Sequence, residues 1–222
     1  EYMAEVFGQI KKNPKLVWYP DYRFDTVVFP AGALAAAQYF SVQFGGQLAG
    51  AAAGVNKTRA DTNLRAAGII GRPNQFELHG FAVEPAVLPT AAGATEALDW
   101  ALIYNTGMFS FQAGGVKNLL DVPLMRIPVA GGPVGVTTTA TAGGATFTNG
   151  AQFASNYYPF HKLVDTLDAN GEPTGKTHKE QLILDGDTNF SVTIDYPIAA
   201  VTLTVAHRVR VYLIGYYGSA VQ

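Results

Sequence analysis

The sequence predicts an all-β protein, a single eight-stranded jelly roll or β-sandwich with long Ala/Gly/Thr-rich loops and a short N-terminal arm. Apolar and polar residues alternate along several short segments, which is typical of half-buried strands. Turn-forming residues recur between these segments, and the alternation of strands with helices that indicates a parallel sheet is absent. At 222 residues the chain is long enough for one large β domain with a substantial core.

Individual strands follow from the alternation. Phe40, Val42 and Phe44 alternate with polar residues and predict a strand. Gly80, inside the apolar segment 76–83, predicts a bulge or a bend. The other predicted strands, in chain order, are residues 99–104 and 108–112 as a hairpin, 117–127 with an interruption at Pro123, 179–184 and 189–195 as a second hairpin, and 205–216.

We divide the chain into an N-terminal arm, residues 1–25, and one sandwich domain, residues 26–222. Apolar residues at helical spacing predict a short helix within residues 1–15, which either docks on a neighbour or packs on its own domain. Two connections, residues 45–74 and 128–156, are long for a compact domain. We expect contacts between subunits at these loops.

Charged residues are scarce. They make up 14% of the chain, against about 25% in an average soluble domain, and the net charge is -2. Residues 26–56 and residues 127–161 contain no Asp, Glu, Lys or Arg. A domain of this size cannot bury both segments, and interface cores are depleted of charge, so we expect other protein to cover part of them. The alternative is that both are solvated Ala/Gly/Thr-rich loops.

Basic residues gather at two places, the first long connection and the end of the N-terminal segment. They are Lys57, Arg59, Arg65 and Arg72, with Asp61 as the sole acid among them, and Lys11, Lys12 and Lys15. These side chains are candidates to contact acidic groups of a neighbouring subunit, or phosphate groups of nucleic acid or lipid. We favour the subunit, because no aromatic residues are interleaved in the connection for base stacking.

No motif indicates catalysis, and we expect no cofactor and no small-molecule substrate. Residues 171–177 are one residue short of a phosphate-binding loop, and residues 185–189 begin like a calcium loop that lacks its later ligands. The four histidines are scattered, so no metal site is predicted. Glu77 and Asp99 are candidates for a carboxylate pair that cleaves glycosides.

The order of several segments resembles a known family. The segments are the uncharged residues 38–44, the basic residues 56–63, residues 72–83, and the closing residues 189–194 and 209–216. In this pattern the chain resembles the single jelly-roll major capsid proteins of tailless icosahedral viruses, chiefly bacteriophages. The resemblance implies a structural protein, not an enzyme, that self-assembles in many copies into a virion shell. It also implies further partners: other capsid proteins, and an internal lipid membrane or the genome through basic residues.

Two other functions stay open. A carbohydrate- or receptor-binding module would stack sugar rings on exposed aromatic side chains, for which the candidates are Trp18, Trp100, Tyr157 and Tyr158. A glycoside hydrolase would need two carboxylates brought together by the fold. We rank the shell protein first, because the charge-free segments call for a protein surface to cover them.

Overall fold

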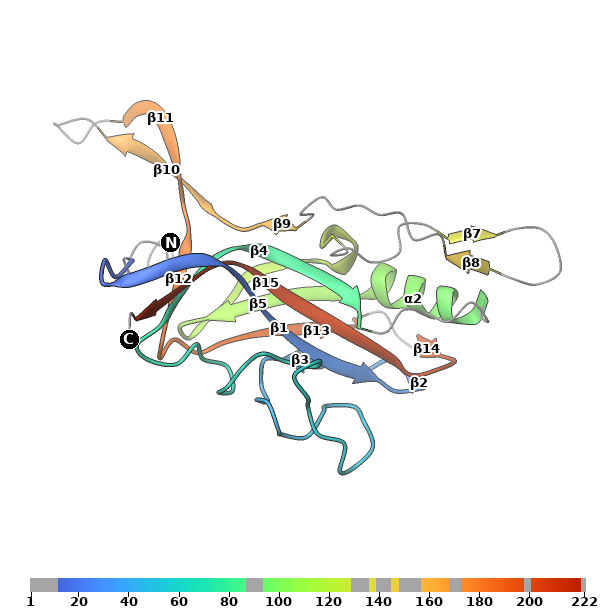
Figure 1. Ribbon diagram of the computed structural model, residues 1–222. Helices are drawn as coiled ribbons and strands as arrows, with labels where there is room; N and C mark the ends of the chain where they lie inside the picture. Colours follow the sequence, from blue (N-terminus) through green and yellow to red (C-terminus); the bar gives the residue numbers. More distant parts are fainter. Residues whose placement is uncertain are drawn as a thin grey trace.

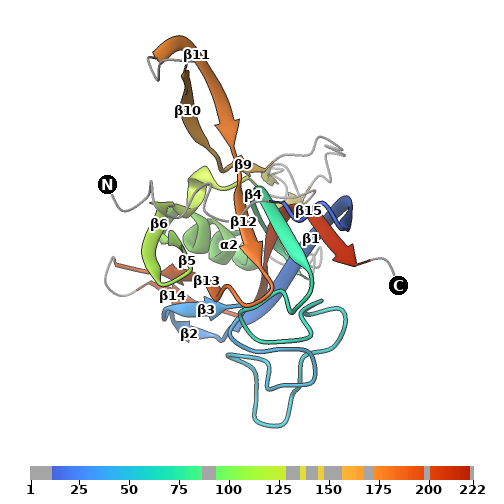
Figure 2. The ribbon, with the colours of Figure 1, turned by 90° about the vertical axis from the view of Figure 1, so that its left-hand side faces the viewer.

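The computed structural model describes residues 12–86, 94–128, 136–138, 145–147, 157–167, 173–197 and 201–220. Two antiparallel sheets pack face to face (Figure 1, Figure 2). The first contains, in spatial order, β1 (Leu16–Phe29), β15 (His207–Ala220), β4 (Gln75–Pro85) and β12 (Leu182–Asp185), with β9 (Tyr158–Pro159) beside β4. The second contains β3 (Ala37–Tyr39), β13 (Phe190–Asp195), β5 (Met108–Ala113) and β6 (Val116–Pro123). The predicted all-β sandwich is confirmed.

Apart from β9, the two sheets contain eight strands, and the first of these along the chain pairs with the last, the second with the seventh, and so on. β1 pairs with β15, β3 with β13, β4 with β12 and β5 with β6, all antiparallel. The chain is therefore one long hairpin rolled over itself, and the pairs β15–β4 and β13–β5 complete the two sheets. Numbered along the chain, the strands are arranged 1-8-3-6 in one sheet and 2-7-4-5 in the other.

The first and last strands are paired over their whole length. The register runs from Leu16 opposite Ala220 to Phe29 opposite His207. Residues 16–25, which we assigned to an N-terminal arm, are therefore part of the first sheet, because the final strand offers them a continuous partner. Most of the helix predicted for residues 1–15 lies outside the described residues.

β4 contains the predicted bulge. Ile214 of β15 lies opposite Gly80, but Gly215 lies opposite Leu78, so His79 is the extra residue. A side chain at Gly215 would lie 1.8 Å from the carbonyl oxygen of Glu77, and this close approach of two backbones explains the glycine.

Aromatic rings fill the space between the sheets. The ring centroid of Phe81 in β4 lies 5.2 Å from that of Phe109 and 4.9 Å from that of Phe111, both in β5. Phe160 adds a fourth ring at 5.4 Å. Because these buried side chains come from both sheets, they hold the two layers together.

The hairpin predicted at residues 99–112 is wrong in its first half, where helix α2 (Ala94–Thr106) replaces a strand. Trp100, Ile103 and Tyr104 are three and four residues apart, so a helix presents all three to the core, whereas a strand would turn Ile103 away from the others. Trp100 and Ile103 are buried. The hydroxyl of Tyr104 donates to the carbonyl oxygen of Val83 at 2.7 Å, which fastens α2 to β4.

The strand predicted around residues 40–44 is also wrong. β3 ends at Tyr39, and Phe40 has a φ of 64°, in the left-handed region, which turns the chain out of the sheet. The N–H of Phe44 instead donates to the carbonyl oxygen of Leu64 at 3.1 Å. This segment is thus part of the long connection to β4, which contributes no strand to either sheet.

Both strands of the second predicted hairpin exist, but they do not pair with each other. β12 belongs to the first sheet and β13 to the second, so the turn at residues 186–189 crosses from one layer to the other. The N–H of Thr188 donates to the carbonyl oxygen of Asp185 at 3.0 Å within this turn.

Shorter elements surround the sandwich. β2 (Gly32–Ala33) pairs with β14 (Thr202–Leu203), and β7 (Val136–Thr138) pairs with β8 (Ala145–Phe147), both toward the end of the sandwich where α2 lies (Figure 1). The 3-10 turn η1 (Leu124–Arg126) follows the predicted interruption at Pro123. β10 (Lys162–Leu167) and β11 (Pro173–Glu180) form a hairpin that projects away from both sheets (Figure 2). Most of the connection predicted at residues 128–156 lies outside the described residues.

Candidate functional site

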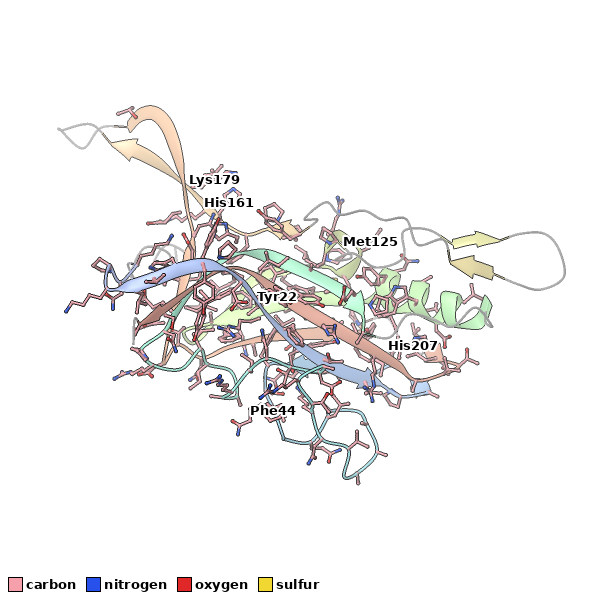
Figure 3. The ribbon with its side chains drawn as sticks, viewed as in Figure 1. Tyr22, Phe44, Met125, His161, Lys179 and His207 are labelled. Atoms are coloured by element: carbon pink, nitrogen blue, oxygen red, sulfur yellow. The ribbon has the colours of Figure 1, made fainter. Side chains whose placement is uncertain are left out.

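Residues 30–56 contain no charged side chain, and we call the exposed part of this segment the uncharged surface. More than half of these residues are exposed. Two of them carry large apolar side chains, Phe44 with 50% and Val55 with 38% of its area exposed. Figure 3 places Phe44 on the loops that extend beyond the sandwich on the side of β2 and β3.

Hydrogen bonds give the uncharged surface a defined shape. The N–H of Leu48 donates to the carbonyl oxygen of Val55 at 2.8 Å, and the N–H of Lys57 donates to that of Gly46 at 2.7 Å. The side-chain amide of Gln47 bonds two further backbone groups inside the same loop. A loop fixed in this way presents the same shape on every copy of the chain.

A buried ion pair anchors the base of this loop. The ammonium of Lys57 lies 2.5 Å from a carboxylate oxygen of Asp25, and neither side chain is more than 1% exposed. Lys57 also donates to the carbonyl oxygen of Val42, while the other oxygen of Asp25 accepts the N–H of Phe40 at 2.7 Å. Burial raises the pKa of Asp25, and the charge and hydrogen bond of Lys57 and the N–H of Phe40 oppose that rise.

Lys57 is therefore not an external contact residue, which corrects its place among the candidates. Its ammonium cannot reach a phosphate or another subunit, because Asp25 and the loop enclose it. The sequence pattern missed this, because charged residues are rarely fully buried.

The other candidate basic residues are dispersed. Arg59, Arg65 and Lys15 are exposed. Arg72 forms an exposed ion pair with Asp187. The ammonium of Lys12 lies 2.6 Å from a carboxylate oxygen of Glu77 and 4.9 Å from the ring centroid of Trp18, and Lys11 lies outside the described residues.

Arg65 and Arg72 do come together with residues that the sequence analysis did not select. They line a cleft of about 720 Å³, here called the arginine cleft, with Tyr19, Asp21, Arg23 and Tyr217. Tyr19, Asp21 and Arg23 alternate along β1 and share one face of it, which is the signal that the sequence offered. The assignment of residues 1–25 to an arm concealed it.

A second set of charged side chains ties β15 to its neighbours. The guanidinium of Arg210 lies 3.3 Å from a carboxylate oxygen of Glu84 and donates to the carbonyl oxygen of Ala60 at 2.6 Å. The hydroxyl of Tyr212 donates to the same carboxylate of Glu84. Burial and this hydrogen bond raise the pKa of Tyr212 to about 12. Arg208 pairs with Asp61 at 3.4 Å, so the long connection is held against β15 at two points.

Glu77 and Asp99 do not form a carboxylate pair. Asp99 lies 3.3 Å from His207, whereas Glu77 lies opposite Tyr216. These two positions of β15 are separated by roughly 30 Å at the rise of a strand, while glycosidase carboxylates lie about 5 to 9.5 Å apart. The candidate pair for glycoside cleavage is therefore incorrect.

Asp99 has a structural role at the turn before β15. Its carboxylate accepts the N–H of Thr204 at 2.7 Å, the hydroxyl of Thr204 at 2.9 Å and the N–H of Val205 at 3.0 Å. Burial would raise the pKa of Asp99, but these hydrogen bonds outweigh burial and lower it. The residue thereby fastens α2 to the last strand.

The described residues contain no group of three His, Asp or Glu side chains that could hold a metal ion. Residues 173–177 of the phosphate-loop-like segment belong to strand β11, so they are not a phosphate-binding loop. Burial lowers the pKa of His161, and the nearby charges of Lys179 and His79 lower it further. Figure 3 labels His161 and Lys179.

The aromatic candidates for sugar stacking differ in how exposed they are. Trp100 belongs to α2 and is buried against the core. Trp18, Tyr157 and Tyr158 are partly exposed. Trp18 shares the outer face of the first sheet with Tyr22 and Tyr216, which are 52% and 38% exposed.

Comparisons with protein-family models, with curated proteins and with solved structures found no significant match. In the part of the chain that the structure describes, no helix is both long and apolar enough to cross a membrane.

Proposed function

We propose that this protein is a structural subunit that self-assembles in many copies into a closed shell, the capsid of a virion. The observation that carries the proposal is the uncharged surface, the exposed part of residues 30–56, because its loop is held by hydrogen bonds and it carries no charge. Protein interfaces are depleted of charge at their centres and enriched in aromatic residues. Phe44 and Val55 have the apolar character that such a centre requires.

The strand order supports the same proposal. We infer an eight-stranded jelly roll from the orders 1-8-3-6 and 2-7-4-5, because a long hairpin rolled over itself produces sheets of this order. Jelly rolls occur in viral capsid proteins, in lectins and in cupins, so this order fits a shell subunit without requiring one.

The projecting β10–β11 hairpin is a second surface for assembly. An isolated two-stranded hairpin is marginally stable in water, and Leu163 on this one is 60% exposed. Contact with a neighbouring subunit would cover it. In a closed symmetric shell many weak contacts of this kind add up to a stable assembly.

Size-exclusion chromatography with light scattering, together with negative-stain electron microscopy, tests the proposal. We expect particles of uniform diameter at high protein concentration, and a shift to monomer in the variant Phe44→Asp, which places a charge in the uncharged surface. Met125→Asp is the control, because Met125 is 61% exposed but lies outside that surface. A wild-type protein that remains monomeric at every concentration and salt condition contradicts the proposal.

A carbohydrate- or receptor-binding module is the second candidate. It is favoured by the exposed rings of Tyr22 and Tyr216 on the outer face of the first sheet, beside Trp18. A glycan array probed with wild-type protein and with Tyr22→Ala tests it. Glycan binding that the variant loses supports this function, and an array without signal counts against a carbohydrate-binding module.

A further inference from the structure

We propose that the arginine cleft binds single-stranded nucleic acid, with Arg65 and Arg72 on phosphate groups and Tyr19 against a base. The inference goes beyond assembly and does not rest on it, because one chain contains the whole cleft. The observation behind it is the meeting of strand β1, strand β15 and the long connection around one recess.

The recess has the size of a ligand site. Its volume of about 720 Å³ falls within the range typical of small-molecule pockets, about 300 to 1,000 Å³. One wall is the face of β1 and β15 that carries Tyr19, Arg23 and Tyr217, and the other is the connection that carries Arg65 and Arg72. A segment of a chain-like ligand can lie between these walls.

The charge in the cleft favours an anion. Three arginines line it, against one acid, Asp21. The guanidinium of Arg23 is already engaged, since it lies 3.3 Å from Asp21 and 4.0 Å above the ring of Tyr217. Burial raises the pKa of Tyr217, and the positive charges of Arg23 and Arg65 both oppose that rise, so Arg65 acts on this part of the cleft.

Two guanidinium groups remain available to a ligand. Arg65 is exposed, and Arg72 has 81% of its side chain exposed while it pairs with Asp187. An ion pair so open to solvent is only weakly stabilising, so Arg72 can exchange Asp187 for a phosphate group of the ligand. Guanidinium groups bind phosphate in a bidentate geometry that lysine does not provide.

The tyrosines favour a nucleic acid over other anions. Tyr19 is 42% exposed, and its ring meets Tyr217 edge-on, with centroids 5.6 Å apart. Tyr217 supports the ring from one side and leaves Tyr19 accessible to a base, which is how single-stranded nucleic acid is commonly held. A planar lipid surface would not enter a recess. The carboxylates of an acidic peptide would pair with the arginines, but they would not stack on the ring of Tyr19 as a base does.

Fluorescence anisotropy of a labelled ten-nucleotide oligothymidylate, measured on the wild-type protein at 50 and 200 mM NaCl, tests the inference. With two phosphate contacts on a single strand, the affinity should fall about sevenfold between these salt concentrations. Light scattering of the same samples records whether the protein is assembled, so the result is separate from the test of the shell proposal.

Three variants locate the binding site. Arg65→Gln should reduce the slope of log affinity against log salt by about 0.7, because it removes one phosphate contact. Tyr19→Leu should weaken binding about fivefold or more without changing that slope. Arg59→Gln is the matched control, an exposed arginine of the same connection outside the cleft, and should change neither value.

Three outcomes would overturn the inference. One is the absence of oligonucleotide binding at 50 mM NaCl. Another is an equal loss of affinity in Arg59→Gln and Arg65→Gln, which would mean attraction by general surface charge. The third is binding to vesicles that contain anionic phospholipid without binding to the oligonucleotide. Circular dichroism of each variant establishes that the β fold is kept.

Discussion

The ammonium of Lys57 and the carboxylate of Asp25 meet 2.5 Å apart in the interior, although the two residues belong to the long connection and to β1. The pair joins the uncharged surface to the first sheet. Asp25 lies within β1, and its second carboxylate oxygen accepts the N–H of Phe40, whose backbone is in the left-handed region.

Replacement of one partner of this ion pair should therefore destabilise the fold strongly. Lys57→Met removes the ammonium and leaves the Asp25 carboxylate buried without a counter-charge, and we expect the free energy of unfolding to fall by about 3 to 5 kcal/mol. Urea unfolding followed by tryptophan fluorescence measures the change.

The double variant Asp25→Asn with Lys57→Met is the control for this prediction. It removes both charges and keeps an oxygen that can accept the N–H of Phe40, so it should be more stable than Lys57→Met alone. If the double variant is as unstable as the sum of two single losses, the pair contributes no mutual stabilisation.

Asp99 should make the free energy of unfolding depend on pH in the acidic range. Its pKa is lowered from the ordinary 3.8 by hydrogen bonds in the folded state, so its contribution is present above pH 4 and is lost as the pH falls through the lowered pKa. Asp99→Asn should lower the free energy of unfolding at pH 7 by about 1 to 3 kcal/mol, because an amide cannot accept all three hydrogen bonds.

The measurement is urea unfolding of wild type and of Asp99→Asn at pH 7 and at pH 3. The difference between the two proteins should shrink at pH 3, and this comparison cancels the contributions of the other acids. A difference that stays constant with pH would mean that the charge of Asp99 is unimportant.

Phe81 should be the most sensitive of the core rings, because it touches rings of the facing sheet and Phe160. Phe81→Ala leaves a cavity between the layers and should lower the free energy of unfolding by about 3 to 5 kcal/mol. Leu163→Ala, at a side chain that is 60% exposed, should stay within about 0.5 kcal/mol of wild type. Thermal unfolding by circular dichroism separates the two, and equal effects would contradict the assigned packing.

Local patterns predicted much of the fold. Alternation located β4, β5, β6, β13 and β15 closely enough to identify a sandwich, and Gly80 marked the bulge of β4. The strand prediction failed at residues 99–104, because the continuous apolar run 100–104 fits a buried strand and a helix equally well. It failed again after Tyr39, because the left-handed backbone of Phe40 depends on the distant carboxylate of Asp25.

The sequence by itself determined the class of the fold, the absence of charge from residues 26–56, and the position of the long connection before β4. These properties depend on composition and on neighbours in the chain. Only the tertiary structure decided which charges are exposed: it buried Lys57 against Asp25, and it brought Arg65 and Arg72 to Arg23 and Tyr217. The reason is that these contacts depend on how the long connection packs against β1 and β15. The paired residues of these two strands are 178 to 204 positions apart, so no local pattern contains the arrangement.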